Sequence, residues 1–153
     1  MRHVAIIAAV ACSAAAVASP PPPPPEYVAH ATGILTGDWD VVQRPEFAAL
    51  FSNDVVAYVG GKKSTIGKAA WLALERETTE KFHRRVEGYA QASLPSTGDG
   101  GDLLILDEVD PIRPYGDPRW STRSILYQFG RDGLIHTVRI TEVHGYLEPA
   151  PGN

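Results

Sequence analysis

Cysteine is almost absent from this sequence, because Cys12 is the only one in 153 residues. Cys12 lies in an N-terminal segment that we expect to be removed, so the mature chain would contain no thiol. This excludes a disulfide framework, a metal site with cysteine ligands and a catalytic cysteine. The domain must then be held by its hydrophobic core alone, and about 130 residues can bury enough surface for that.

Positive charge is also scarce, and the formal net charge is -4 at pH 7. The basic residues are scattered, so no stripe could release counterions from a nucleic acid and no basic amphipathic helix could dock on an anionic membrane. The longest apolar run, residues 4–18, is shorter than the about 20 residues that span a bilayer as a helix. We therefore expect no nucleic-acid partner and no membrane span.

Signatures of cofactor sites are missing as well. The sequence has no phosphate-binding loop, no dinucleotide fingerprint and no G-x-S-x-G elbow. The histidines show no recognisable ligand spacing, since they are scattered at His30, His83, His136 and His144. We expect a protein that works without a cofactor and without a metal.

The N-terminus has the pattern of a signal peptide. Arg2 precedes the apolar run, and Ala16 and Ala18 fit the A-x-A pattern of a cleavage site. We expect cleavage after residues 1–18 and a secreted or periplasmic protein. The alternative is a lipoprotein that is anchored through Cys12.

The remaining chain divides into a spacer, a domain and a tail. Residues 19–25 are dominated by proline and form a semi-rigid extended spacer. Residues 26–148 form one domain, and residues 149–153 form a short tail. The length and the 44% hydrophobic content suit a single globular domain.

The order of expected elements indicates an α+β fold. Helical patterns at 26–31, 45–51 and 69–76 surround a short strand at 55–59. Four long strands follow, at 81–94, 102–109, 120–129 and 134–143, and a hairpin turn at 131–133 joins the last two. Such a meander forms an antiparallel sheet with the helices on one face.

Four segments in this order carry a resemblance to a known family. They are GDWD at 37–40, ALFSNDVV at 49–56, IGKAAW at 66–71 and YQFGRDGLI at 127–135. The chain resembles the SnoaL-like branch of the nuclear transport factor two superfamily. The resemblance implies a curved antiparallel sheet wrapped around three N-terminal helices, forming a cone with an internal pocket. Because that family includes isomerases, cyclases, dehydratases, epoxide hydrolases and non-catalytic association domains, the resemblance implies a pocket and not a reaction.

Strand alternation predicts an inward arginine and an inward glutamate. Arg123 shares a face with Ile125 and Tyr127, and Glu142 shares a face with Val138 and Ile140. Counted from the hairpin turn, Arg123 and Glu142 lie roughly opposite each other. Arg123 would then be an electrophile or oxyanion partner and Glu142 a general base. The alternative is a structural ion pair at the rim, or two side chains in solvent.

His30 becomes a third candidate through the resemblance. It falls where the isomerase members carry an oxyanion-stabilising tyrosine, and a histidine could donate there or shuttle a proton near neutral pH. The isomerases' base position holds Val59, and their second acid falls near Ile125, so steroid-isomerase chemistry is not expected. Glu75 aligns roughly with a supporting pocket tyrosine, but an exposed helix acid is the simpler interpretation. A half-exposed helix residue is the alternative for His30.

These observations predict a protein that binds a small, largely apolar organic molecule. Acid-base chemistry by His30, Arg123 and Glu142 is the enzymatic hypothesis, and a non-catalytic carrier or association module is the alternative. We expect a homodimer through the outer face of the sheet, where His83, Arg85, Glu87, Tyr89 and Gln91 form one polar face. The predicted pocket lining is Val59, Trp71, Ile125, Tyr127, Val138 and Ile140.

Overall fold

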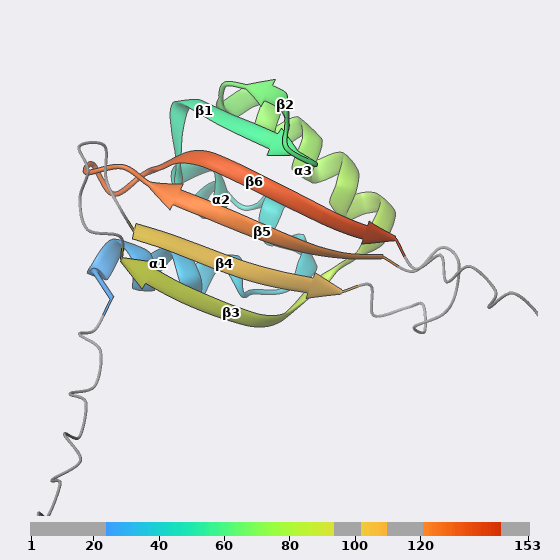
Figure 1. The fold of residues 1–153 in the computed structure, drawn as a ribbon, viewed down its shortest axis with the longest axis horizontal. Helices are drawn as coiled ribbons and strands as arrows, with labels where there is room; N and C mark the ends of the chain where they lie inside the picture. Colours follow the sequence, from blue (N-terminus) through green and yellow to red (C-terminus); the bar gives the residue numbers. More distant parts are fainter. Residues whose placement is uncertain (1–23, 94–101, 110–120, 145–153) are drawn as a thin grey trace, which may run out of the picture.

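The computed structural model describes residues 24–93, 102–109 and 121–144 (Figure 1). The described chain is α+β, as predicted. Its helices are α1 (Glu26–Leu35), the 3-10 helix η1 (Trp39–Gln43), α2 (Pro45–Ala49) and α3 (Lys68–Phe82). Its strands are β1 (Phe51–Val59), β2 (Lys62–Ile66), β3 (Arg85–Ser93), β4 (Asp102–Val109), β5 (Ser121–Phe129) and β6 (Ile135–His144).

The six strands form one curved sheet in the order β2-β1-β6-β5-β4-β3. All neighbours are antiparallel except β1 and β6, which are parallel. The sheet is therefore mixed, because one parallel pair lies within the expected antiparallel arrangement. The sequence order hides this pairing, because Val59 is the Cα partner of Ile140, from the opposite end of the domain.

Strand β2 was also not predicted. Gly60 and Gly61 form the turn before it, and both have a positive φ, of 55° and 78°. The turn returns the chain along β1 as a hairpin, with Val59 opposite Lys62. The sequence did not indicate β2 because most of its residues are polar, and an edge strand that carries lysines lacks an apolar face.

Helix α3 is longer than the predicted 69–76. Its inner face continues through Glu75 and Thr79, one and two turns after Trp71, and all three are buried. The i, i+4 spacing keeps these side chains on one face although two of them are polar. The helix ends at His83, whose φ of 47° places it in the left-handed region.

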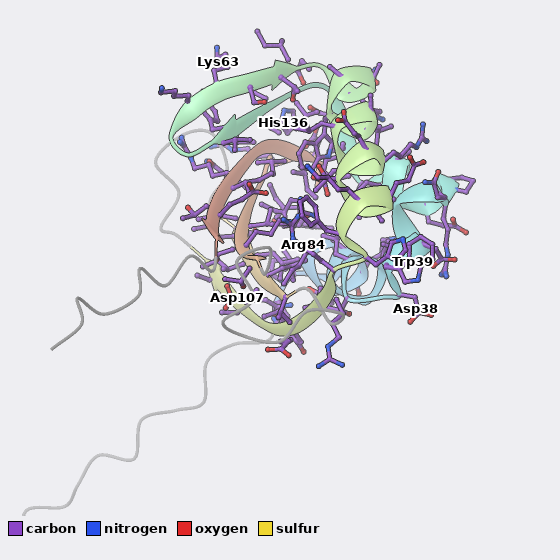
Figure 2. The ribbon with its side chains drawn as sticks, turned by 90° about the vertical axis from the view of Figure 1, so that its right-hand side faces the viewer. Asp38, Trp39, Lys63, Arg84, Asp107 and His136 are labelled. Atoms are coloured by element: carbon purple, nitrogen blue, oxygen red, sulfur yellow. The ribbon has the colours of Figure 1, made fainter. Side chains whose placement is uncertain are left out.

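The core lies between the concave face of the sheet and the helices. Figure 2 shows the sheet curling around this space, with α3 along its open side. The Phe51 ring is tilted against the rings of Phe47, Trp71 and Tyr127, at centroid distances of 5.1, 5.7 and 6.2 Å. The predicted inward phasing of β5 and β6 is confirmed, since Ile125, Tyr127, Val138 and Ile140 are buried.

Polar contacts attach α1 to strands β3 and β4, at one edge of the sheet. The Tyr27 hydroxyl donates a hydrogen bond to the Asp102 carboxylate in β4. The Gln91 side-chain amide donates to the Thr32 hydroxyl at 2.8 Å. Gln91 therefore faces α1, and the prediction that it shares an outer polar face with Arg85 was wrong. Tyr89 lies on the same face as Gln91, since the two residues pair with Leu106 and Leu104. A register shift between Val86 and Gly88 interrupts the alternation of β3.

None of the described helices combines the length and the apolar character needed to cross a membrane. The predicted signal peptide, most of the proline-rich spacer and the tail lie outside the described residues.

The Tyr27 contact predicts a loss of stability at high pH. The hydrogen bond to Asp102, with a smaller contribution from burial, raises the pKa of Tyr27 from 10.0 to about 12. In the unfolded chain the hydroxyl ionises near pH 10, so its stabilising contribution is complete below that pH and is lost as the pH rises toward 12. The free energy of unfolding should fall less steeply between pH 10 and 12 in Tyr27→Phe than in the wild type.

Urea denaturation at several pH values measures this, with Tyr89→Phe as the exposed control. Parallel curves for all three proteins would contradict it.

Candidate functional site

A buried ion-pair cluster lies at the centre of the molecule, around Arg123 of β5. The guanidinium donates two parallel hydrogen bonds to Glu75 of α3, at 2.9 Å from Nη1 to Oε1 and 2.8 Å from Nη2 to Oε2. Its Nε donates to Glu108 Oε2 of β4 at 2.6 Å. The side chains of Arg123 and Glu75 are 4% and 2% exposed. The helix and two adjacent strands are thereby joined through one side chain.

Charge compensation keeps Arg123 ionised in this buried place. Burial disfavours the charged form, but the two neighbouring carboxylates outweigh it and hold the pKa of Arg123 well above its ordinary value. Tyr127 lies beside the same group. Burial first, and then the charges of Glu75 and Glu108, raise the pKa of its hydroxyl well above the usual range. Tyr127 is therefore a neutral group that can donate a hydrogen bond at physiological pH.

A second arginine extends the cluster. Arg84 follows the left-handed residue His83 and is buried, and its Nη2 lies 3.5 Å from Glu142 Oε1 of β6. Burial, followed by the nearby Arg123 charge, lowers the pKa of Arg84, and Glu142 opposes this shift. Figure 2 shows Arg84 inside the curve of the sheet, beside α3. We call these five residues the charged cluster: Glu75, Arg84, Glu108, Arg123 and Glu142.

Two cavities border the charged cluster, and both contact Glu75, Thr78 and Arg123. The inner cavity also contacts Glu108 and Tyr127, and its volume is about 30 Å³. A buried water needs about 10–15 Å³, so the inner cavity has room for water and not for an organic molecule.

The outer pocket lies between α3 and the strands β1 and β6, and its volume is about 250 Å³. Apolar and charged side chains both line it. They are Val59, Leu74, Phe82 and Ile140, together with Glu75, Glu77, Lys81, Arg123 and Glu142.

The structure brings two of the three predicted catalytic residues into one pocket. Arg123 and Glu142 are Cα partners on β5 and β6, so the predicted register is confirmed. Arg123 and Glu142 do not form the ion pair that was the alternative interpretation, because the guanidinium of Arg123 is held by Glu75 and Glu108. Glu142 instead faces Arg84, with 28% of its side chain exposed.

His30 does not take part in this arrangement. Helix α1 buries Val28, Ala31, Thr32 and Leu35, and His30 is exposed. The prediction that His30 points into the cavity was therefore wrong. The resemblance correctly places His30 on the first helix, but it does not determine which side of that helix faces the sheet.

The predicted pocket lining divides into three groups. Val59 and Ile140 line the outer pocket, and Tyr127 lines the inner cavity. Trp71, Ile125 and Val138 are buried in the core.

Sequence reasoning missed three members of the charged cluster as site residues. Glu75 was interpreted as an exposed helix acid, although its spacing of four from Trp71 places it on the inner face. Glu108 continues the inward alternation of Leu104 and Leu106, which are buried. Arg84 carries no such signal, because it lies in the connection between α3 and β3.

No group of three or more histidine, aspartate, glutamate or cysteine residues is arranged to hold a metal ion within the described ranges. Arg123 and Glu75 form the hydrogen bonds described above with other side chains of the protein. The site is therefore built from carboxylates, guanidinium groups and a tyrosine, which suit proton transfer and the binding of partial charges.

No protein-family model matches the sequence, and no curated protein matches it either. Solved structures do share the fold. A phenazine biosynthesis-related protein from Pseudomonas aeruginosa gives a TM-score of 0.56 at 14% identity, over 76% of this chain and 75% of that chain. A nuclear transport factor two-like protein of unknown function from an Exiguobacterium species gives 0.51 at 12% identity, over 76% and 98%.

The orange carotenoid protein of Anabaena, in a structure that binds canthaxanthin, gives a TM-score of 0.52 at 15% identity, over 72% of this chain and 35% of that chain. The chain thus has the nuclear transport factor two-like cone fold that the sequence resemblance implied. At these identities the likeness concerns the fold, which is compatible with the binding of a small molecule.

Removing one carboxylate from the charged cluster should lower the free energy of unfolding. In Glu75→Gln, Arg123 stays buried but loses one of its two charged partners, and breaking a buried pair in this way costs about 3–5 kcal/mol. Guanidinium denaturation measures the change in the free energy of unfolding. The matched control is Glu87→Gln, which breaks the exposed pair with Arg85 and should cost less than about 1 kcal/mol. An equal decrease in the free energy of unfolding in the two variants would show that the buried pair stabilises the fold no more than the exposed pair does.

Proposed function

We propose that the outer pocket binds a small, largely apolar organic molecule and that the chain catalyses a cofactor-free proton transfer on it. The observation that carries this proposal is the position of Arg123, which is fixed by two carboxylates and lines the pocket beside Glu142. A fixed cation and a separate, partly exposed carboxylate in one apolar pocket are the minimum parts of an acid-base site.

The walls of the outer pocket support a small apolar ligand. Val59, Leu74 and Ile140 contribute aliphatic surface, and Phe82 contributes a ring. The volume of about 250 Å³ lies just below the range of about 300–1,000 Å³ that is usual for drug-sized ligands. The pocket therefore suits a molecule of one or two rings better than a steroid-sized one.

Glu142 is the proposed general base. Its side chain lines the outer pocket and is 28% exposed, with Arg84 at 3.5 Å, whereas Glu75 is closed off in its bonds to Arg123. The carboxylate would take a proton from the carbon next to a carbonyl group. The electron pair of that C–H bond would form a C=C bond as the π pair of the C=O bond moves to the oxygen. Return of the proton to the same carbon or to a conjugated one completes an isomerisation without any co-reactant.

Arg123 is the proposed partner of the negative oxygen that forms. A guanidinium has five N–H donors, and three of them bond to Glu75 and Glu108, so two are left for a ligand. Because Arg123 is already held in place, little reorganisation is needed when charge develops on the substrate. His30 has no role in this proposal.

The alternative function is a non-catalytic carrier or association module. The filled interior favours it, because Phe51, Trp71 and Tyr127 occupy the centre of the cone and leave an inner cavity of about 30 Å³. A carrier would use the outer pocket for binding and would leave bound carbonyl compounds chemically unchanged.

Hydrogen exchange on a simple ketone distinguishes the two functions. With cyclohexanone in deuterated buffer, the wild type should accelerate deuterium uptake at the α-carbons, as followed by NMR. Glu142→Gln removes the base and should lower the acceleration about 100-fold or more. Glu77→Gln is the control, since it removes an exposed acid from the same pocket wall. Saturable binding of cyclohexanone without any acceleration by the wild type would contradict catalysis and favour the carrier.

A further inference from the structure

A third pocket, which we call the Trp39 pocket, lies on the outside of the molecule. It is formed where α1 ends, η1 begins and α3 passes into β3, and its volume is about 540 Å³. Figure 2 shows Trp39 and Asp38 at this surface, close to one end of α3. The residues that line it are Thr36, Gly37, Asp38, Trp39, Arg44, His83, Arg85 and Val86.

The pocket contains an exposed aromatic surface. The Trp39 side chain is 47% exposed, which is unusual for the largest apolar side chain. Its ring stacks on the His83 imidazole, with a centroid distance of 4.4 Å and an interplanar angle of 28°. His83 has a φ of 47°, in the left-handed region where a side chain is disfavoured. The chain thus holds His83 in a strained conformation that places its ring against Trp39.

Two guanidinium groups line the same pocket. Arg44 donates to Asp40 at 2.9 Å and Arg85 to Glu87 at 3.2 Å, and all four side chains are about half exposed or more. Exposed ion pairs of this kind contribute little to stability, so a ligand can replace the acidic partner at small cost. The charged side chains that line the pocket are these two arginines and Asp38, while the acidic partners Asp40 and Glu87 lie beside the arginines but do not line the pocket.

We propose that the Trp39 pocket is a binding site for a planar aromatic anion, such as an aromatic carboxylate. The ring of the ligand would stack on Trp39, and its carboxylate would accept hydrogen bonds from Arg44 and Arg85. A guanidinium matches a carboxylate in shape and charge, and an indole face suits a flat ring. This site is separate from the proposed acid-base function, because Glu75, Arg123 and Glu142 do not line it.

Titration of the full chain with 2-naphthoate tests the site, with 2-naphthylmethanol as the uncharged probe. The indole N–H signal of Trp39 in a ¹⁵N NMR spectrum, assigned with Trp39→Phe, should shift with 2-naphthoate. The uncharged probe should bind at least tenfold more weakly. The double variant Arg44→Gln/Arg85→Gln should raise the Kd of 2-naphthoate about tenfold, since two exposed charge contacts are lost. Arg76→Gln, an exposed arginine of α3, should leave it unchanged.

The results of this titration test the Trp39 pocket and not the proposed acid-base function. Equal affinity for the two probes, or an unchanged Kd in the double variant, would overturn recognition of an anion. A Trp39 signal that does not move at saturating 2-naphthoate would overturn the site itself. Trp39, Arg44, Arg76 and Arg85 are exposed, so their substitution should preserve folding. Glu142→Gln should not affect 2-naphthoate binding, which separates this result from the fate of the proposed acid-base function.

Discussion

The buried bonds of Arg123 to Glu75 and Glu108 are the interaction on which the rest of the structure depends. Helix α3 is mostly polar after Leu74, and the buried positions of that part, Glu75 and Thr79, are polar, so apolar packing alone does not hold it on the sheet. The bidentate bond between Glu75 and Arg123 attaches that part of the helix to the sheet. A buried ion must be compensated to offset its desolvation, so removing any one of the three side chains leaves a buried charge with less compensation.

The same bonds lie between two spaces of different size. On one side, Tyr127 and Glu108 border a cavity with room only for water. On the other side, Arg123 and Glu142 border a larger pocket with apolar walls. In the proposed function, the charge that holds the helix in place is also the fixed charge of the binding pocket. Structural and chemical roles of Arg123 are therefore expected to be inseparable in its variants.

The sequence allowed local features to be predicted better than long-range ones. Alternation alone showed that Arg123, Tyr127 and Ile140 face inward, because each strand has a clear apolar side. The parallel pairing of β1 with β6 joins residues from opposite ends of the domain, and no local pattern encodes it. The burial of Glu75 depends on a partner 48 residues away, so a helical acid was taken for an exposed one. His30 was misplaced because the similarity fixed its helix and not the rotation of that helix.

The most direct test of the central claim is the NMR signal of the Arg123 guanidinium during titration with cyclohexanone. The Nε–H resonance, assigned with Arg123→Lys, should move with the same Kd as the methyl signals of Val59 and Ile140. That result would place the ligand against the fixed cation in the outer pocket. Saturation of the methyl shifts with an unmoved Arg123 resonance, or no shift at any of the three residues, would contradict the account.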